Sequence, residues 1–185
     1  TIDLQPTLAY EISEFLSIGG GLNIQYADAE LESAIFAGSE GITDLSGDDW
    51  SYGYTVGLQL RPTSATTFGA SYRSDITHEL DGRIVISGSG LADRNDPATA
   101  DLDLPDVATF GVSQDVGARW RVMGQATWFG WNNFKDIDPE PETGVDIAPI
   151  VQNYQTTWAL ALGAEYLLNE AWTLRGGMQF DQTPT

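Results

Sequence analysis

The chain has 185 residues and no cysteine, so it holds neither a disulfide framework nor a thiolate metal site. Its 27 acidic residues face only 8 basic ones, and the resulting net charge of −19 argues against a nucleic-acid partner. The single histidine, His78, argues against histidine-based catalysis and a multi-histidine metal site, and we expect it to be a polar residue near a rim.

Membrane insertion through a helix is excluded because no apolar run reaches ~18 residues. A membrane β-barrel remains open, since one of its strands needs only ~9–11 alternating residues. Residues from Thr1 onward show no export signal, so we expect a mature or partial chain if the protein is exported.

Alternation with a period of two dominates the sequence and predicts β-strands. Between Trp50 and Arg61 every second residue is apolar, and the residues between them are small or polar. The same pattern predicts about eight strands, and the fourth of them can be followed as far as Ile86. The predicted strands span residues 2–12, 16–26, 50–61, 68–76, 104–114, 120–128, 154–166 and 172–181.

The predicted connections alternate strictly in length. Short turns are expected near residues 13–15, 62–65, 115–119 and 168–171, and long acidic segments at 27–49, 87–103 and 132–152. Outer-membrane barrels have short turns on one side and long loops on the other. A soluble β-sandwich has no reason to sort its loops by length, so we predict an all-β, transmembrane antiparallel barrel.

Aromatic residues support this prediction. Tyr154 and Tyr166 lie twelve residues apart on one predicted face, which spans roughly 30 Å at ~3.4 Å per residue and ~40° tilt. Tyrosine and tryptophan also flank both the short turns and the long segments, as in interfacial belts. The alternative is that these rings seal the rims of a soluble sheet.

The first connection is short, which places Thr1 and Thr185 on the long-loop side. A complete bacterial barrel normally starts and ends on the short-turn side. We therefore expect residues 1–185 to be one partial outer-membrane β-barrel domain, an interior piece of a larger barrel.

Several phrases resemble FadL-type long-chain fatty-acid transporters. They are Leu-Ala-Tyr at 8–10 followed by Leu-Ser-Ile-Gly-Gly-Gly-Leu-Asn at 16–23, Gly-Ala-Ser-Tyr-Arg-Ser at 69–74, Leu-Pro-Asp at 104–106, residues 128–131, and Leu-Arg-Gly-Gly at 174–177 with Phe-Asp-Gln-Thr-Pro at 180–184. The resemblance implies a barrel of about fourteen strands whose lumen is plugged by an N-terminal hatch and which passes hydrophobic molecules, in several members sideways through the wall. Compared with that arrangement, we expect residues 1–185 to lack the hatch and the closing strands.

Two sets of residues are candidates for substrate binding. Leu31, Ile35, Phe36 and Ile42 lie in the first long segment, where helical spacing between 28 and 37 suggests a short amphipathic helix. Such a helix would expose a capture surface, or alternatively pack down to seal the barrel mouth. Arg73 and Arg175 are candidates to pair with a carboxylate in the lumen, and the alternative is that they neutralise nearby acids such as Asp75 or Asp181.

We predict passive transport of hydrophobic compounds, most plausibly long-chain fatty acids, across the bacterial outer membrane, with lipid and lipopolysaccharide as neighbours. The alternatives are a structural or adhesive barrel and a soluble lipid-binding β-protein. No nucleophile–base pair is recognisable, so we expect no enzyme and no cofactor. The acidic segments (Asp136, Asp138, Glu140, Glu142 and Asp146; also Asp44, Asp48 and Asp49) could share divalent ions with lipopolysaccharide, but a solvated loop without a metal is favoured.

Overall fold

The fold is described here from a computed structural model, which covers residues 1–36, 40–87, 93–134, 136–137, 140–141, 150–151 and 154–185. The described chain is almost entirely antiparallel β-structure, with one short 3-10 turn at Trp131–Asn133. No helix in the described part is long and apolar enough to span a membrane. The strands are β1 (Ile2–Leu4), β2 (Thr7–Ser13), β3 (Leu16–Phe36), β4 (Glu40–Thr63), β5 (Thr66–Arg73), β6 (Ile76–Ser87), β7 (Arg94–Leu104), β8 (Val107–Val116), β9 (Trp120–Phe129), β10 (Asp136–Ile137), β11 (Glu140–Pro141), β12 (Ile150–Val151), β13 (Thr157–Leu167) and β14 (Thr173–Asp181).

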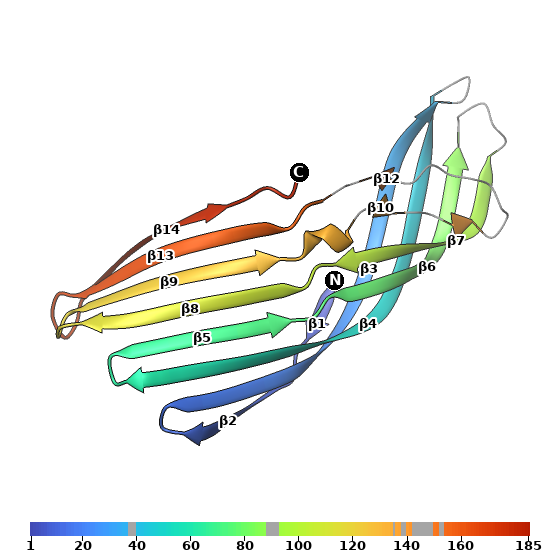
Figure 1. Ribbon diagram of the computed structural model, residues 1–185. Coiled ribbons are helices and arrows are strands. Elements are labelled where there is room, and N and C mark those ends of the chain that lie inside the picture. The colour runs from blue at the N-terminus through green and yellow to red at the C-terminus, as the bar shows by residue number, and fades with distance from the viewer. Residues whose placement is uncertain (37–39, 88–92, 135, 138–139, 142–149, 152–153) are drawn as a thin grey trace.

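Eight strands form one continuous sheet, which we call the wall. Its order is β2-β3-β4-β5-β8-β9-β13-β14, and each strand pairs antiparallel with the next. Tight turns join β2–β3, β4–β5, β8–β9 and β13–β14 at one end of the sheet (Figure 1). In the β8–β9 turn Gly117 has φ 66°, a backbone conformation that glycine adopts without steric cost. The predicted short turns are thus confirmed.

The first predicted long loop is instead a long hairpin. β3 and β4 remain paired without a register shift from Leu16↔Leu60 to Phe36↔Glu40. The helix expected between residues 28 and 37 is therefore wrong, because strand pairing satisfies the backbone groups there. A few apolar residues at helical spacing favour a helix only weakly, and the ladder that continues from the wall overrides them.

The second predicted long loop is also largely strand. β5 ends at Arg73, and the chain resumes as β6 at Ile76 after a break at Ser74 and Asp75. β6 pairs with β7 and with the distal part of β4, so 94–104 is strand rather than loop. We call residues 27–36, residues 40–49, β6 and β7 together the arm, which extends away from the wall in Figure 1.

The wall has two chemically different faces and no protein layer over its apolar one. Leu22, Phe110, Leu160 and Phe180 all point outward, with Leu160 51% exposed. Most of the buried apolar side chains among the described residues (Ile76, Leu80, Ala98, Ala100 and Ala27) belong to the arm rather than to the wall. Two stacked sheets with a dry interior are therefore absent from the described chain, and the exposed apolar face requires an apolar solvent.

Aromatic pairs mark both ends of the wall. Trp120 packs against Tyr166 with a centroid distance of 4.7 Å beside the short turns, and Tyr26 packs against Trp50 at 5.1 Å at the other end. Tyr154 lies just before β13 rather than inside it, and packs against Trp131 and Phe134. Rings at both ends of the apolar band fit the interfacial belts predicted from the sequence.

The same substitution should destabilise the protein much more on the apolar face than on the inner face. Leu160→Arg places a charge in the middle of the exposed apolar face and should destabilise the protein in phospholipid vesicles by about 2–4 kcal/mol. Ala161→Arg, one residue further on the opposite face, should change the free energy of unfolding by less than about 1 kcal/mol. Urea unfolding in vesicles measures both, and equal losses would contradict the assignment of the two faces.

Candidate functional site

The middle of the inner face of the wall carries mainly small and uncharged polar side chains. The register aligns one residue from each strand across the sheet in two successive rows. The first row is Ser17, Gln59, Gly69, Gly111, Gln125, Ala161 and Gln179, and the second is Gly19, Gly57, Ser71, Thr109, Thr127, Ala159 and Asp181. Because short side chains leave space in front of a sheet, these rows make a smooth surface rather than a packed core.

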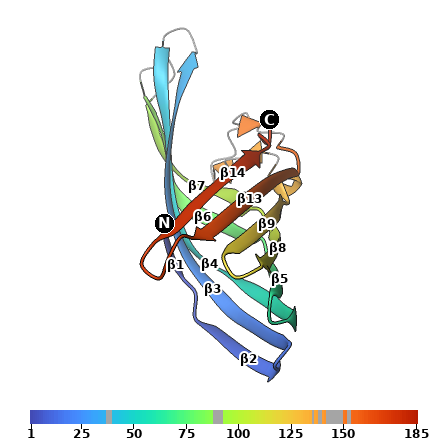
Figure 2. The same ribbon diagram turned by 90° about the vertical axis from the view of Figure 1, so that its left-hand side faces the viewer.

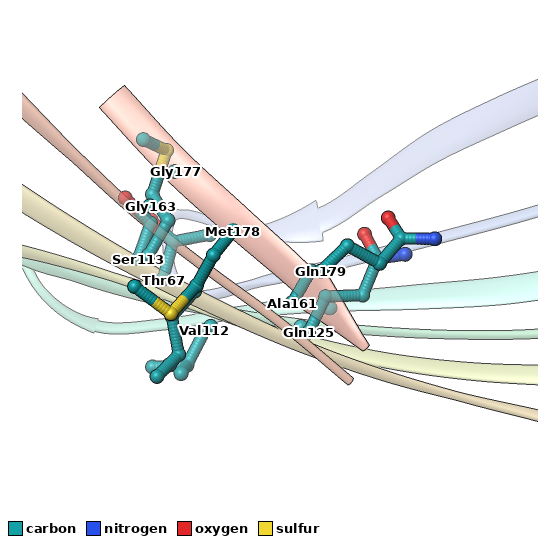
Figure 3. A pocket seen from close by; sticks show the side chains of 14 residues that line it. Thr67, Val112, Ser113, Gln125, Ala161, Gly163, Gly177, Met178 and Gln179 are labelled. Carbon is teal, nitrogen blue, oxygen red and sulfur yellow. The ribbon is translucent and has the colours of Figure 1, made fainter. Parts of the chain in front are cut away.

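A hollow of about 590 Å³ lies along this part of the wall, between β5 and β14. Glycines line it on five strands, at Gly69, Gly111, Gly124, Gly163 and Gly177. Figure 3 shows Gln125, Ala161 and Gln179 side by side, as their register requires. The sheet is curved (Figure 2), and its smooth inner face offers both apolar surface and amide groups to a ligand.

Near the short turns a row of charged side chains crosses four strands. Arg121 Nε lies 2.7 Å from Asp115 Oδ1, and Arg175 Nε lies 2.8 Å from Glu165 Oε1. A longer contact of 3.8 Å joins Arg121 to Glu165 and connects the two pairs. The row contains two arginines and two acids, so its formal charge is zero.

At the other end of the wall, Arg73 of β5 reaches Asp3 of β1 with an Nη2–Oδ2 distance of 2.6 Å. β3 and β4 lie between these two strands in the sheet. With neighbouring strands ~4.8 Å apart, such a contact requires both side chains to lean over the same inner face. The Arg73–Asp3 pair therefore bridges the inner surface.

Uncharged polar groups line up beneath this bridge. Gln5 Nε2 donates to Thr55 Oγ1 at 3.0 Å, and Thr55 Oγ1 donates to Asn23 Oδ1 at 3.1 Å. Asn23 is fully buried, and its Nδ2 has no hydrogen-bond partner. An unpaired buried donor costs about 1–3 kcal/mol. Asn23 is enclosed by protein, so a ligand cannot reach this amide without displacing the side chains around it.

The arm joins the wall through a small core. Ile76 of β6 lies over Gly53, and His78 is fully buried between Gln25 and Asp49. Its Nε2 is 3.0 Å from Gln25 Oε1, and its Nδ1 is 3.1 Å from Asp49 Oδ2. The expectation that His78 is merely a polar rim residue is thus wrong, because its ring is enclosed where β6 folds against β3 and β4.

The candidate residues named from the sequence fall into two groups. Arg73 and Arg175 lie on the inner face and both pair with acids, as the alternative interpretation held, but the partners are Asp3 and Glu165 rather than Asp75 and Asp181. Leu31, Ile35, Phe36 and Ile42 lie along the β3–β4 hairpin, where Leu31 is opposite Leu45 and Ile42 is opposite Ala34. Their role in substrate capture stays a prediction.

Some functional candidates escaped the sequence analysis. Glu165 could have been found, because it faces Arg175 across a hairpin that the sequence predicts. Asp3, Asn23 and His78 could not, because their partners are contributed by distant segments. Of the acidic residues weighed as possible metal ligands in the sequence analysis, Asp138, Glu142 and Asp146 lie outside the described residues. The described part of the chain contains no cluster of three metal-ligating side chains.

The junction between arm and wall depends on a glycine. A Cβ atom at Gly53 would lie 2.8 Å from both Ile76 Cγ1 and Ser74 Oγ, whereas one at Gly69 would meet nothing within 4 Å. Gly53→Ala should therefore lower the stability of the folded protein by about 1–3 kcal/mol through overpacking. Gly69→Ala should stay within about 0.5 kcal/mol of the wild type. Urea unfolding of both variants measures this, and equal effects would contradict the packing described here.

The sequence is similar to outer membrane transport proteins along its whole length. The sequence profile of the outer membrane protein transport protein family (OMPP1/FadL/TodX) matches residues 1–185. A long-chain fatty acid transport protein of Escherichia coli O6:H1 is 23% identical over 226 residues, covering 100% of this chain and 50% of that protein. Outer membrane protein P1 of Haemophilus influenzae is 22% identical over 98% of this chain and 46% of its own length.

Solved structures show the same architecture. A Pseudomonas aeruginosa FadL homologue superimposes with a TM-score of 0.83 at 26% identity, covering 99% of this chain and 50% of that one. The Ralstonia pickettii toluene transporter TbuX gives a TM-score of 0.80 at 21% identity, with 97% and 55% covered. The chain thus spans about half the length of the relatives it matches, and its wall corresponds to part of a larger barrel.

Proposed function

Since this chain belongs to the OMPP1/FadL/TodX family of outer membrane transport proteins, we propose that its wall lines a channel through which hydrophobic compounds diffuse passively across the bacterial outer membrane. The observation that carries the proposal is the division of one sheet into an exposed apolar face and an inner face on which small and uncharged polar side chains predominate. The first face suits lipid, and the second leaves room for a ligand. The proposal includes no chemical step.

Long-chain fatty acids are the substrate class we propose first. The relatives of this chain include proteins named for their transport, and the sequence of the wall resembles them. Capture of the substrate at Leu31, Ile35, Phe36 and Ile42 of the β3–β4 hairpin belongs to the same proposal. The strand register assigns positions 31 and 35 to one face of this hairpin and positions 36 and 42 to the other. Small aromatic compounds are the second candidate, because a toluene transporter shares the fold.

Two neighbouring residues on β5 provide a matched test of passage along the inner face. Ser71 lies in the inner row beside Gly57 and Thr109, whereas Ala70 lies beside Leu58 and Phe110 on the apolar face. Ser71→Trp should obstruct the channel and slow uptake severalfold, because the large ring fills space that small side chains leave open. Ala70→Trp adds the same ring on the lipid side and should leave uptake unchanged.

The measurement is uptake of radiolabelled oleate by Gram-negative cells that lack their own fatty-acid channel and express the natural full-length protein. Wild-type protein should restore uptake above the empty vector. Folding of both variants is checked by their shift in gel mobility on heating. Absence of uptake would reject the fatty-acid assignment, and equal uptake by the two folded tryptophan variants would reject passage along this face.

A further inference from the structure

In the described part of the chain, the inner face offers no unpaired cation between its two charged ends. Arg73 is held by Asp3, and Arg121 and Arg175 are held by Asp115 and Glu165. Arg61 and Arg119 lie at the short-turn ends, where Arg61 donates to Gln59. Among the described residues, a carboxylate inside the wall could therefore gain an arginine only by displacing an acid that is already paired.

The remaining charges on the approach and along the wall are predominantly negative. Glu11 and Asp181 align with the inner rows, and neither has an arginine partner in the described part of the chain. The arm contains twelve acidic residues and two arginines in its sequence. Since like charges repel most strongly where water is scarce, an anionic head group meets an unfavourable field at the arm and again along the wall.

Uncharged hydrogen-bonding groups, in contrast, are available on this face. Gln5 is exposed on this face, at the outer end of the hydrogen-bonded series that joins it to Thr55 and Asn23. Further along the wall, Gln125 and Gln179 flank Ala161 within the hollow. Amide donors of this kind satisfy a hydroxyl, a carbonyl or a protonated carboxyl group without requiring a counter-charge.

We infer that this wall selects the uncharged form of its hydrophobic substrates, so that alcohols, hydrocarbons and protonated fatty acids pass in preference to carboxylates. The inference rests on the proposed function and deepens it by naming the charge state of the substrate. It assigns the Arg73–Asp3 pair the role of removing a carboxylate site from the lumen. Releasing Arg73 from Asp3 should therefore create the affinity for anions that the wild type lacks.

The test compares two ligands with the same alkyl chain, dodecanoate and dodecanol. Equilibrium binding of their radiolabelled forms is measured with the natural full-length protein in nonionic detergent at pH 8. Wild-type protein should bind dodecanol more tightly. Asp3→Asn should improve dodecanoate binding relative to dodecanol by about fivefold, the size expected for one partly exposed charge pair. The matched control Asp181→Asn removes the same charge from the inner face without releasing an arginine, and should shift the ratio by less than about twofold.

A double variant, Asp3→Asn with Arg73→Gln, identifies the cause. It should return the ratio to the wild-type value, because the released cation is gone. Tighter wild-type binding of dodecanoate than of dodecanol would overturn the inference, as would an equal shift in the Asp3 and Asp181 variants or a gain that survives in the double variant. If neither ligand binds the folded wild type, the proposed function itself fails.

Discussion

The structure depends on the continuous antiparallel ladder that joins the eight strands of the wall. Within the residues that the structure describes, no protein layer covers the apolar face of this sheet, so lipid must do so, and lipid cannot satisfy backbone N–H and C=O groups. Those groups therefore have to pair between strands. The long, unshifted register of β3 with β4 shows how far the pairing extends. The chemical division between the two faces follows directly, because successive residues of a paired strand point to opposite sides.

Charge on the inner face is arranged under a second constraint. The inner arginines of the wall are paired with acids from a neighbouring strand or from across the face, so their charges are neutralised locally. Between these pairs the inner surface consists mainly of glycine, alanine, serine, threonine and glutamine, with the acids Glu11 and Asp181 among them. Such a surface can contact alkyl and aromatic groups alike. This agrees with the names of the relatives and structural neighbours, which refer to different hydrophobic compounds.

The arm shows where reasoning from sequence was insufficient. Residues 27–49 contain many acids, and a few apolar residues at helical spacing suggested a loop with a short helix. The structure continues two strands through the same residues, because each backbone group finds its partner across the hairpin. Likewise, the break at Ser74 and Asp75 directs β6 onto β4 and buries His78. Neither feature has a local signal, since both are decided by which strands lie side by side.

The sequence by itself determined the strands of the wall, their two faces, the positions of the short turns and the resemblance to a family of outer-membrane transporters. These properties follow from alternation with a period of two and from turn residues, both of which act over a few neighbouring positions. Only the tertiary structure decided that Arg73 pairs with Asp3, that Asn23 keeps a buried donor unpaired, and that residues 27–36, 40–49 and 94–104 of the arm are strand rather than loop. These features depend on the curvature of the sheet and on contacts between residues far apart in the chain, which no local pattern encodes.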